Sequence, residues 1–176
     1  MNLITYAPQW LAALTAVALL VAAAEDLVRL RISNITVLVV LASAIVAMAF
    51  AGFHGPLWQN ALVFAGILAL GTLAFSRELL GGGDVKLLAA TGLWVGFAAA
   101  PWLLAAIFLA GGVVAVLFII VRKLRGRSRR EGSRIPYGVA IAAGAIFVLG
   151  TQYSNSGASR SERPLPSIKG VHLSPR

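Results

Sequence analysis

The 176-residue sequence contains no cysteine. Disulfide bonds, cysteine-based zinc sites and thiol catalysis are therefore excluded together. Charge is also scarce, because charged residues make up only 12% of the chain and only six residues are acidic. A soluble domain of this length carries about twice that share of charge. Hydrophobic residues make up 59%, so the composition predicts a polytopic membrane protein with no room for a second, soluble domain of ordinary size.

Apolar runs separated by short polar segments predict an all-α polytopic membrane protein with about six transmembrane helices. The uncharged run Leu87–Val121 would be about 52 Å long as one helix, so we expect two short spans there with a turn near residues 100–102. Residues 1–150 form the predicted membrane domain, and the Ser-, Pro- and Gly-rich tail 151–176 is predicted to be disordered. The other four expected spans are Ile4–Ala24, Ile35–Phe50 (with Asn34 as its N-cap), Asn60–Phe75 and Pro136–Gly150.

The positions of Lys and Arg predict the topology. Two follow the first span, two precede the fourth, seven lie in the loop 122–134 and four lie in the tail, whereas the turns at 51–58 and near Pro101 have none. The positive-inside rule therefore places the three basic loops in the cytoplasm and the N-terminus outside, with the basic tail as the one exception. The net charge of +9 is interpreted as a topology signal and as contacts with anionic lipids, and no nucleic-acid partner is predicted.

Four of the six acidic residues, Glu25, Asp26, Glu78 and Asp84, fall at the predicted cytoplasmic ends of spans. Asp26 closes the first span and Asp84 opens the fourth, so both are expected at the same membrane depth. Carboxylates in such segments are costly and usually functional. Two carboxylates that share a proton can activate a water molecule against a peptide carbonyl. The simpler alternative is that Asp84 only caps the helix that follows it.

The ends of the two helices predict how the proton is shared. Negative charge is disfavoured at the C-terminal end of a helix, where Asp26 lies, and favoured at an N-terminal end, where Asp84 lies. We therefore expect Asp26 to carry the shared proton more often. Gly81, Gly82 and Gly83 precede Asp84, and such side-chain-free residues let an extended substrate backbone approach closely. A flexible loop between helices is the alternative interpretation of this run.

Three segments resemble the prepilin peptidases, the type IV leader peptidase family. Residues 81–90 (GGGDVKLLAA) resemble the GxGD signature of that family. Asp26, followed by Arg29, Ile32 and Asn34, resembles its first aspartate motif, and residues 135–141 (IPYGVAI) resemble the start of its last helix. The resemblance is strongest to the short form that serves Flp-type (tight-adherence) pilus systems and lacks a methyltransferase domain. Ser33 replaces the proline usual in the family and is expected to loosen the start of the second span.

The resemblance implies a GxGD aspartyl endopeptidase of the bacterial inner membrane. Such an enzyme removes the short basic leader of a prepilin at the cytoplasmic face, cutting after a glycine just ahead of the hydrophobic helix. Asp26 and Asp84 would be its catalytic pair, and neither a cofactor nor a metal is implied. The implied partners are prepilin substrates and membrane lipids.

Three further residues are candidates for substrate contact. Glu25 and Glu78 would attract the basic leader, although the favoured interpretation is that they balance Arg29 and Arg77 at the membrane interface. Lys86 would steady Asp84 or the substrate, or extend to the lipid headgroups. From another functional class, a small proton- or cation-coupled carrier would use the same two aspartates as ion sites. Their place at the membrane edge and the absence of a visible inverted repeat count against a carrier.

Overall fold

The computed structural model describes residues 2–52, 56–124 and 136–161, and shows six α-helices in them. Five of these helices, all except α4, are long and apolar enough to cross a membrane. The prediction of an all-α polytopic membrane protein is therefore confirmed. After a short 3-10 helix, η1 (Leu3–Thr5), come α1 (Gln9–Arg29), α2 (Asn34–Ala51), α3 (Leu57–Ser76), α4 (Gly82–Gly92), α5 (Ala100–Leu124) and α6 (Tyr137–Ser161).

The region predicted as two short spans is divided differently. Helix α4 has only 11 residues, about 17 Å of helix, which is too short to cross a bilayer alone. Turns occupy residues 93–99, and α5 begins at Ala100 and runs for 25 residues. The turn predicted near residues 100–102 therefore lies a few residues earlier, at 93–99. Pro101 is the second residue of α5, and proline is tolerated in a first helical turn because the N–H groups there need no intrahelical partner.

The end of the chain also differs from the prediction. Helix α6 was expected to stop at Gly150 but continues to Ser161, so the first part of the predicted tail is helical. Residues 162–176, most of the basic loop 122–134 and residues 53–55 lie outside the described residues.

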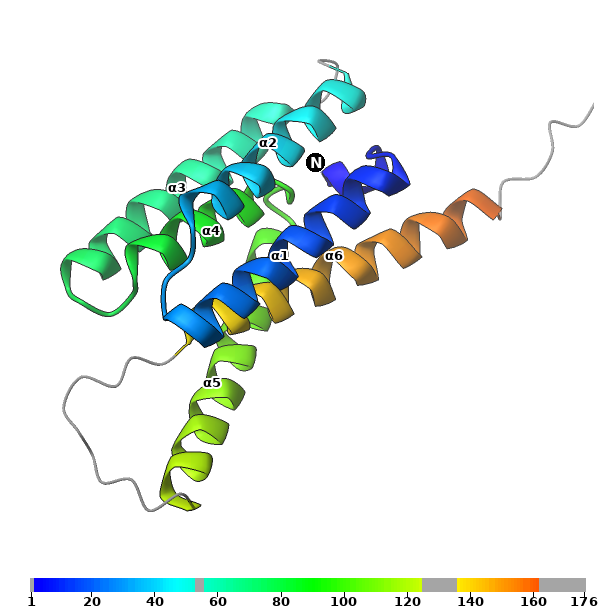
Figure 1. Ribbon diagram of the computed structural model, residues 1–176. Helices are drawn as coiled ribbons and strands as arrows, with labels where there is room; N and C mark the ends of the chain where they lie inside the picture. The colour runs from blue at the N-terminus through cyan, green and yellow to red at the C-terminus, as the bar shows by residue number, and fades with distance from the viewer. Residues whose placement is uncertain (1, 53–55, 125–135, 162–176) are drawn as a thin grey trace, which may run out of the picture.

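The helices form a bundle in which α4 lies inside (Figure 1). Helix α4 packs against α2, α3 and α6, while α1 packs against α2 and α6. Helix α5 has its main contact with α6, and its C-terminal part projects away from the other helices in Figure 1. The short helix α4 and the long helix α1 therefore both contact α2 on one side and α6 on the other.

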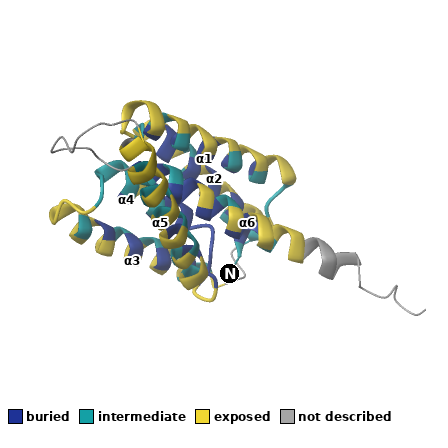
Figure 2. Cartoon of the chain, turned by 90° about the horizontal axis from the view of Figure 1, so that it is seen from below, coloured by how far each residue is buried: buried dark blue, intermediate teal, exposed yellow. Residues whose placement is uncertain are grey.

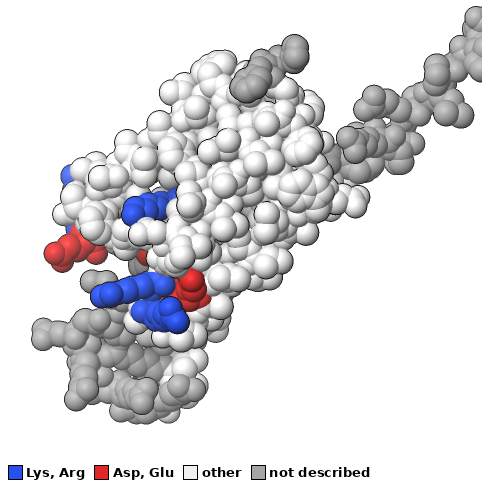
Figure 3. Space-filling model, turned by 45° about the horizontal axis from the view of Figure 1, so that its top comes forward, with Lys and Arg blue, Asp and Glu red and all other residues white. Residues whose placement is uncertain are grey.

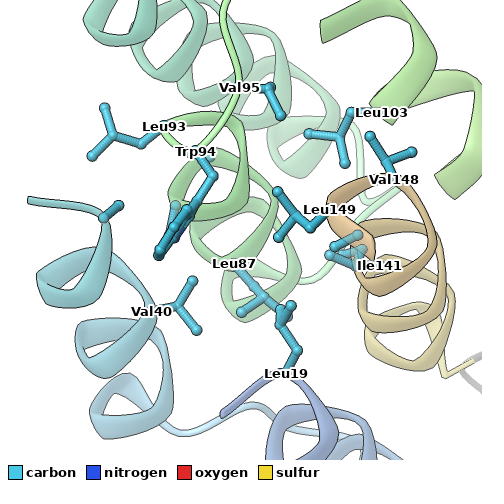
Figure 4. Close-up of a cluster of buried hydrophobic side chains, with 14 of the residues drawn as sticks. Leu19, Val40, Leu87, Leu93, Trp94, Val95, Leu103, Ile141, Val148 and Leu149 are labelled. Carbon is cyan, nitrogen blue, oxygen red and sulfur yellow. The ribbon is translucent and has the colours of Figure 1, made fainter. Parts of the chain in front are cut away.

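The core gathers side chains from most of these helices around the C-terminal end of α4. Figure 4 shows Leu19 of α1, Val40 of α2, Leu87 of α4 and Leu149 of α6 turned toward the same region as Trp94. All of them are buried, and Trp94 is completely so. The outward faces of the helices are instead exposed and apolar, as the outer surface of a membrane bundle is expected to be (Figure 2).

Glycines let two pairs of helices cross closely. An added Cβ at Gly92 of α4 would lie 2.6 Å from Cδ1 of Ile67 in α3. An added Cβ at Gly144 of α6 would lie 2.7 Å from the backbone nitrogen of Ile107 in α5. Contacts that short do not occur for real side chains. At Gly144 the neighbour is backbone, so this position requires glycine, whereas at Gly92 the end of the Ile67 side chain would have to shift. This is the small-residue packing typical of membrane helices.

The two ends of the bundle differ in character. At one end, the backbone N–H of Leu3 donates to the carbonyl of Trp94 (3.1 Å) and the amide of Asn60 donates to the carbonyl of Leu93 (3.0 Å). The charged side chains visible in Figure 3 gather at the other end. That end contains the last turn of α1, the start of α2, the α3–α4 connection and the start of α4. Both candidate catalytic aspartates therefore lie at the charged end.

Candidate active site

Asp26 lies in the last turn of α1 and is held by a helix far away in the sequence. Its side chain is buried, and its Oδ2 accepts a hydrogen bond of 2.6 Å from the backbone N–H of Gly138. Gly138 is the second residue of α6, so Asp26 faces a helix N-terminus, where the free N–H groups and the helix dipole stabilise negative charge. An added Cβ at Gly138 would lie 2.8 Å from that same Oδ2. The close approach therefore depends on glycine at this position.

Asp84 lies in the first turn of α4 and uses its two oxygens differently. Its Oδ2 accepts a hydrogen bond of 3.2 Å from the backbone N–H of Gly81, the residue that precedes the helix. Its Oδ1 is buried and has no hydrogen-bond partner among the described residues. Asp84 thus caps α4, as the simpler interpretation predicts, but this function occupies only one oxygen. The other oxygen is available to a substrate or a water molecule.

The two aspartates influence each other electrostatically. Asp84 lies outside the five membrane-spanning helices, and its burial, followed by the nearby charge of Asp26, raises its pKa to about 6. Asp26, in contrast, faces the N–H of Gly138 at a helix N-terminus, which favours its ionised form. Burial thus disfavours the charged form of Asp84, whereas the hydrogen bond from Gly138 offsets part of the cost of a charge on Asp26. The expectation from sequence, that Asp26 carries the shared proton more often, considered only the C-terminal end of α1, and the contact with the start of α6 counts against it.

Ile32 in the α1–α2 loop lies against both aspartate sites. An added Cβ at Gly83, next to Asp84, would lie 3.2 Å from Cβ of Ile32. An added Cβ at Gly138, next to Asp26, would lie 2.8 Å from Cδ1 of the same side chain. Ile32 therefore packs against the start of α4 and the start of α6 at once.

The loop that carries Ile32 is fixed by Glu25. Oε2 of Glu25 accepts hydrogen bonds of 2.9 Å from the backbone N–H of Ser33 and from the hydroxyl of Thr36. Ser33, and not Asn34 as expected, is the N-cap of α2, since its side chain accepts from the N–H of Ile35 (3.2 Å). Ser33 therefore caps the start of α2, which counts against the expectation that it loosens this region. The carboxylate of Glu25 thus accepts hydrogen bonds from residues of its own chain.

The other predicted contact residues lie around the same end of the bundle. Lys86 donates from Nζ to Oδ1 of Asn34 (3.0 Å), a bond that joins α4 to the start of α2. Glu78 is exposed in the α3–α4 connection, with a left-handed φ of 60°. Gly81 is the residue before α4, and Gly82 and Gly83 form its first turn. The glycine run is thus largely helical, and only its first residue belongs to a loop.

Gly138 and Ile32 are the contributors that reasoning from residue types did not identify. Both lie in segments that resemble the family motifs, but neither carries a chemical group that would mark it as part of a site. The signal for Gly138 was a glycine two residues after Pro136, at the start of a helix, where a close approach of another element is common. Its contact with Asp26 spans 112 residues and required the structure.

A metal site would need a different set of side chains. Among the residues described, no group of three His, Cys, Asp or Glu side chains lies close enough together to hold an ion. The site consists instead of two carboxylates at two helix ends, and Oδ1 of Asp84 has no hydrogen-bond partner among the described residues.

The family model of the type IV leader peptidase family matches residues 13–119. The chain belongs to the type IV leader peptidase family. It is therefore related to peptidases that act on prepilin-type substrates, and its five apolar helices make it a multi-pass membrane protein. The match includes Asp26 and Asp84 but ends before α6. Comparisons with curated proteins and with solved structures returned no match.

Proposed function

We propose that this member of the leader peptidase family is an aspartyl endopeptidase in which Asp26 and Asp84 activate a water molecule. The observation that carries the proposal is the asymmetry of the pair. Asp26 is buried and accepts a hydrogen bond from the N–H of Gly138. Asp84, in contrast, has a buried Oδ1 without a hydrogen-bond partner among the described residues. One carboxylate suited to the ionised form beside one suited to the protonated form is the arrangement that general acid–base hydrolysis needs.

The proposed reaction follows from these protonation states. Ionised Asp26 removes a proton from a water molecule as its oxygen attacks the carbonyl carbon of the scissile peptide. Protonated Asp84 donates its proton to the carbonyl oxygen as the tetrahedral intermediate forms. The intermediate then collapses: ionised Asp84 takes a proton back from one of its hydroxyl groups, the C–N bond breaks, and the leaving nitrogen takes the proton from Asp26. The two products are the leader with a new carboxyl group and the pilin with a new amino group.

The proposed substrate is an Flp-type prepilin, cut at the cytoplasmic face of the bacterial inner membrane after a glycine ahead of its hydrophobic helix. The family supports a prepilin-type substrate. The Flp-type class rests on the resemblance of the sequence motifs, and the side of the membrane rests on the distribution of Lys and Arg. The exposed carboxylate of Glu78 is proposed to attract the basic leader, with Gly81–Gly83 beside the substrate backbone. Lys86, near the start of α4, is proposed to help position the substrate.

Co-expression with a tagged Flp-type prepilin tests the proposal. The wild-type protein is expected to convert the prepilin into a faster-migrating form on a gel. Asp26→Asn and Asp84→Asn should each abolish this conversion while the protein remains in the membrane at normal amounts. Normal processing by either variant would refute the aspartate pair. An ion carrier would leave the prepilin uncut in all three cases.

A further inference from the structure

The α1–α2 loop and the first turn of α2 make three contacts that bear on the proposed catalytic pair. Leu30 ends α1 with a left-handed φ of 51°, and its N–H donates to the carbonyl of Asp26 (2.9 Å). Glu25 holds the other end of the loop through the N–H of Ser33 and the hydroxyl of Thr36, both at 2.9 Å. The loop is thus fastened on both sides of Ile32.

Ile32 lies against the glycines next to both aspartates, so its fixed position limits how each of them can move. Its Cβ and backbone oxygen lie 3.2 and 3.3 Å from the place of an added Cβ at Gly83, and its Cδ1 lies 2.8 Å from that place at Gly138. Gly83 immediately precedes Asp84, and Gly138 donates to Asp26. A shift of the loop would therefore move the start of α4 relative to the start of α6.

We propose that Glu25 is a positioning residue, which holds Ile32 between the helix ends of Asp84 and Gly138 and so fixes the two aspartates relative to each other. The inference rests on the proposed function, because it concerns the same pair. It also replaces the alternative role of Glu25 as an attractor for the basic leader. In the positioning role Glu25 acts as a hydrogen-bond acceptor, and its negative charge is dispensable.

Two substitutions separate these roles. Glu25→Gln keeps an acceptor oxygen for Ser33 and Thr36 but removes the charge, whereas Glu25→Ala removes both. Cleavage of a purified Flp-type prepilin would be followed with each full-length variant in lipid vesicles. We expect Glu25→Gln to keep kcat and KM within about threefold of wild type, and Glu25→Ala to lower kcat at least about tenfold with little change in KM, because misplaced catalytic groups lose rate and not affinity.

Several results would overturn the inference. A raised KM in Glu25→Gln equal to that in Glu25→Ala would show that the charge binds the leader. An unchanged kcat in Glu25→Ala would show that the loop does not position the pair. If Glu25→Ala fails to fold, Thr36→Val and Thr36→Ser decide the question. The valine variant loses one donor to Glu25 and should have a lower kcat. The serine variant keeps the hydroxyl and should have a kcat near that of the wild type.

A second measurement is independent of peptidase activity. Because the chain has no cysteine, thiols introduced at Asn34 and Lys86, which are in contact through their side chains, would be the only ones present. A short bifunctional thiol reagent should cross-link this pair quickly in the otherwise unchanged chain and with Glu25→Gln, but several-fold more slowly with Glu25→Ala. Equal rates in all three would overturn the positioning role. Absence of prepilin cleavage by the wild type, with the cross-linking pattern as expected, would refute the proposed function and leave the fixed loop supported.

Discussion

Gly138→Ala tests whether the contact between α6 and Asp26 is needed for activity. The added methyl group would lie 2.8 Å from Oδ2 of Asp26, 2.9 Å from its Cβ and 2.8 Å from Cδ1 of Ile32. Contacts of this length force a shift, and the hydrogen bond of 2.6 Å between Gly138 and Asp26 would be lost or lengthened. A hydrogen bond to a charged group contributes about 1.5–3 kcal/mol. At 1.36 kcal/mol per factor of ten, the expected loss in kcat/KM is roughly 10- to 150-fold.

The matched control for this prediction is Gly150→Ala. Gly150 lies on the same helix α6, and an added Cβ there meets nothing within 4 Å. The same change from glycine to alanine should therefore leave cleavage of a purified Flp-type prepilin unaffected. The assay compares the initial rates of the two variants at equal amounts of folded protein. Equal rates for Gly138→Ala and Gly150→Ala would refute the idea that the start of α6 holds Asp26 for catalysis.

Three further predictions concern stability. Because the pKa of Asp84 is raised from its ordinary 3.8 to about 6 by burial and by Asp26, the folded protein loses stability as pH rises through this window. Asp84→Asn should increase the free energy of unfolding at pH 8 by about 1–3 kcal/mol, measured as a higher melting temperature, and leave it unchanged at pH 4; an equal effect at both would contradict the raised pKa. Gly144→Ala, whose Cβ would lie 2.7 Å from the backbone nitrogen of Ile107, should lower thermal stability by about 1–3 kcal/mol, whereas Gly112→Ala, with open space around it, should not. Thr15→Val removes the buried hydrogen bond of 2.9 Å to Ser43 between α1 and α2 and should cost about 0.6–2 kcal/mol in denaturant titration, with Thr72→Val, which loses only a bond to its own helix, as the control.

The broad fold could be predicted from the sequence because the membrane permits few architectures. Apolar runs long enough to cross a bilayer locate five of the six helices, since backbone groups in lipid must be satisfied within helices. The boundaries of α4 within the long uncharged run were harder to predict. Its 11 residues and the turns after them are as apolar as a span, so hydropathy does not show where the helix ends. The fact that α4 lies inside the bundle was also not accessible, because it depends on packing between helices.

The site was predictable only where residue type carries chemistry. Rare carboxylates at matching helix ends made Asp26 and Asp84 the candidates, but their contacts with other elements could not be predicted. The expected protonation of the pair did not take into account the hydrogen bond that Asp26 accepts from the N–H of Gly138 on α6. Glu25 illustrates the same limit. Its charge indicated attraction of a basic leader, whereas the structure shows hydrogen bonds to Ser33 and Thr36.

The most direct test of the central claim is the mass of the product formed by purified protein in lipid vesicles. With a Flp-type prepilin as substrate, the wild-type protein should yield a pilin that begins just after the glycine preceding its hydrophobic helix. Asp26→Asn and Asp84→Asn, each folded and inserted as the wild type is, should yield only the uncut prepilin. Product of the same mass from either variant at a rate near that of the wild type would contradict a mechanism based on Asp26 and Asp84.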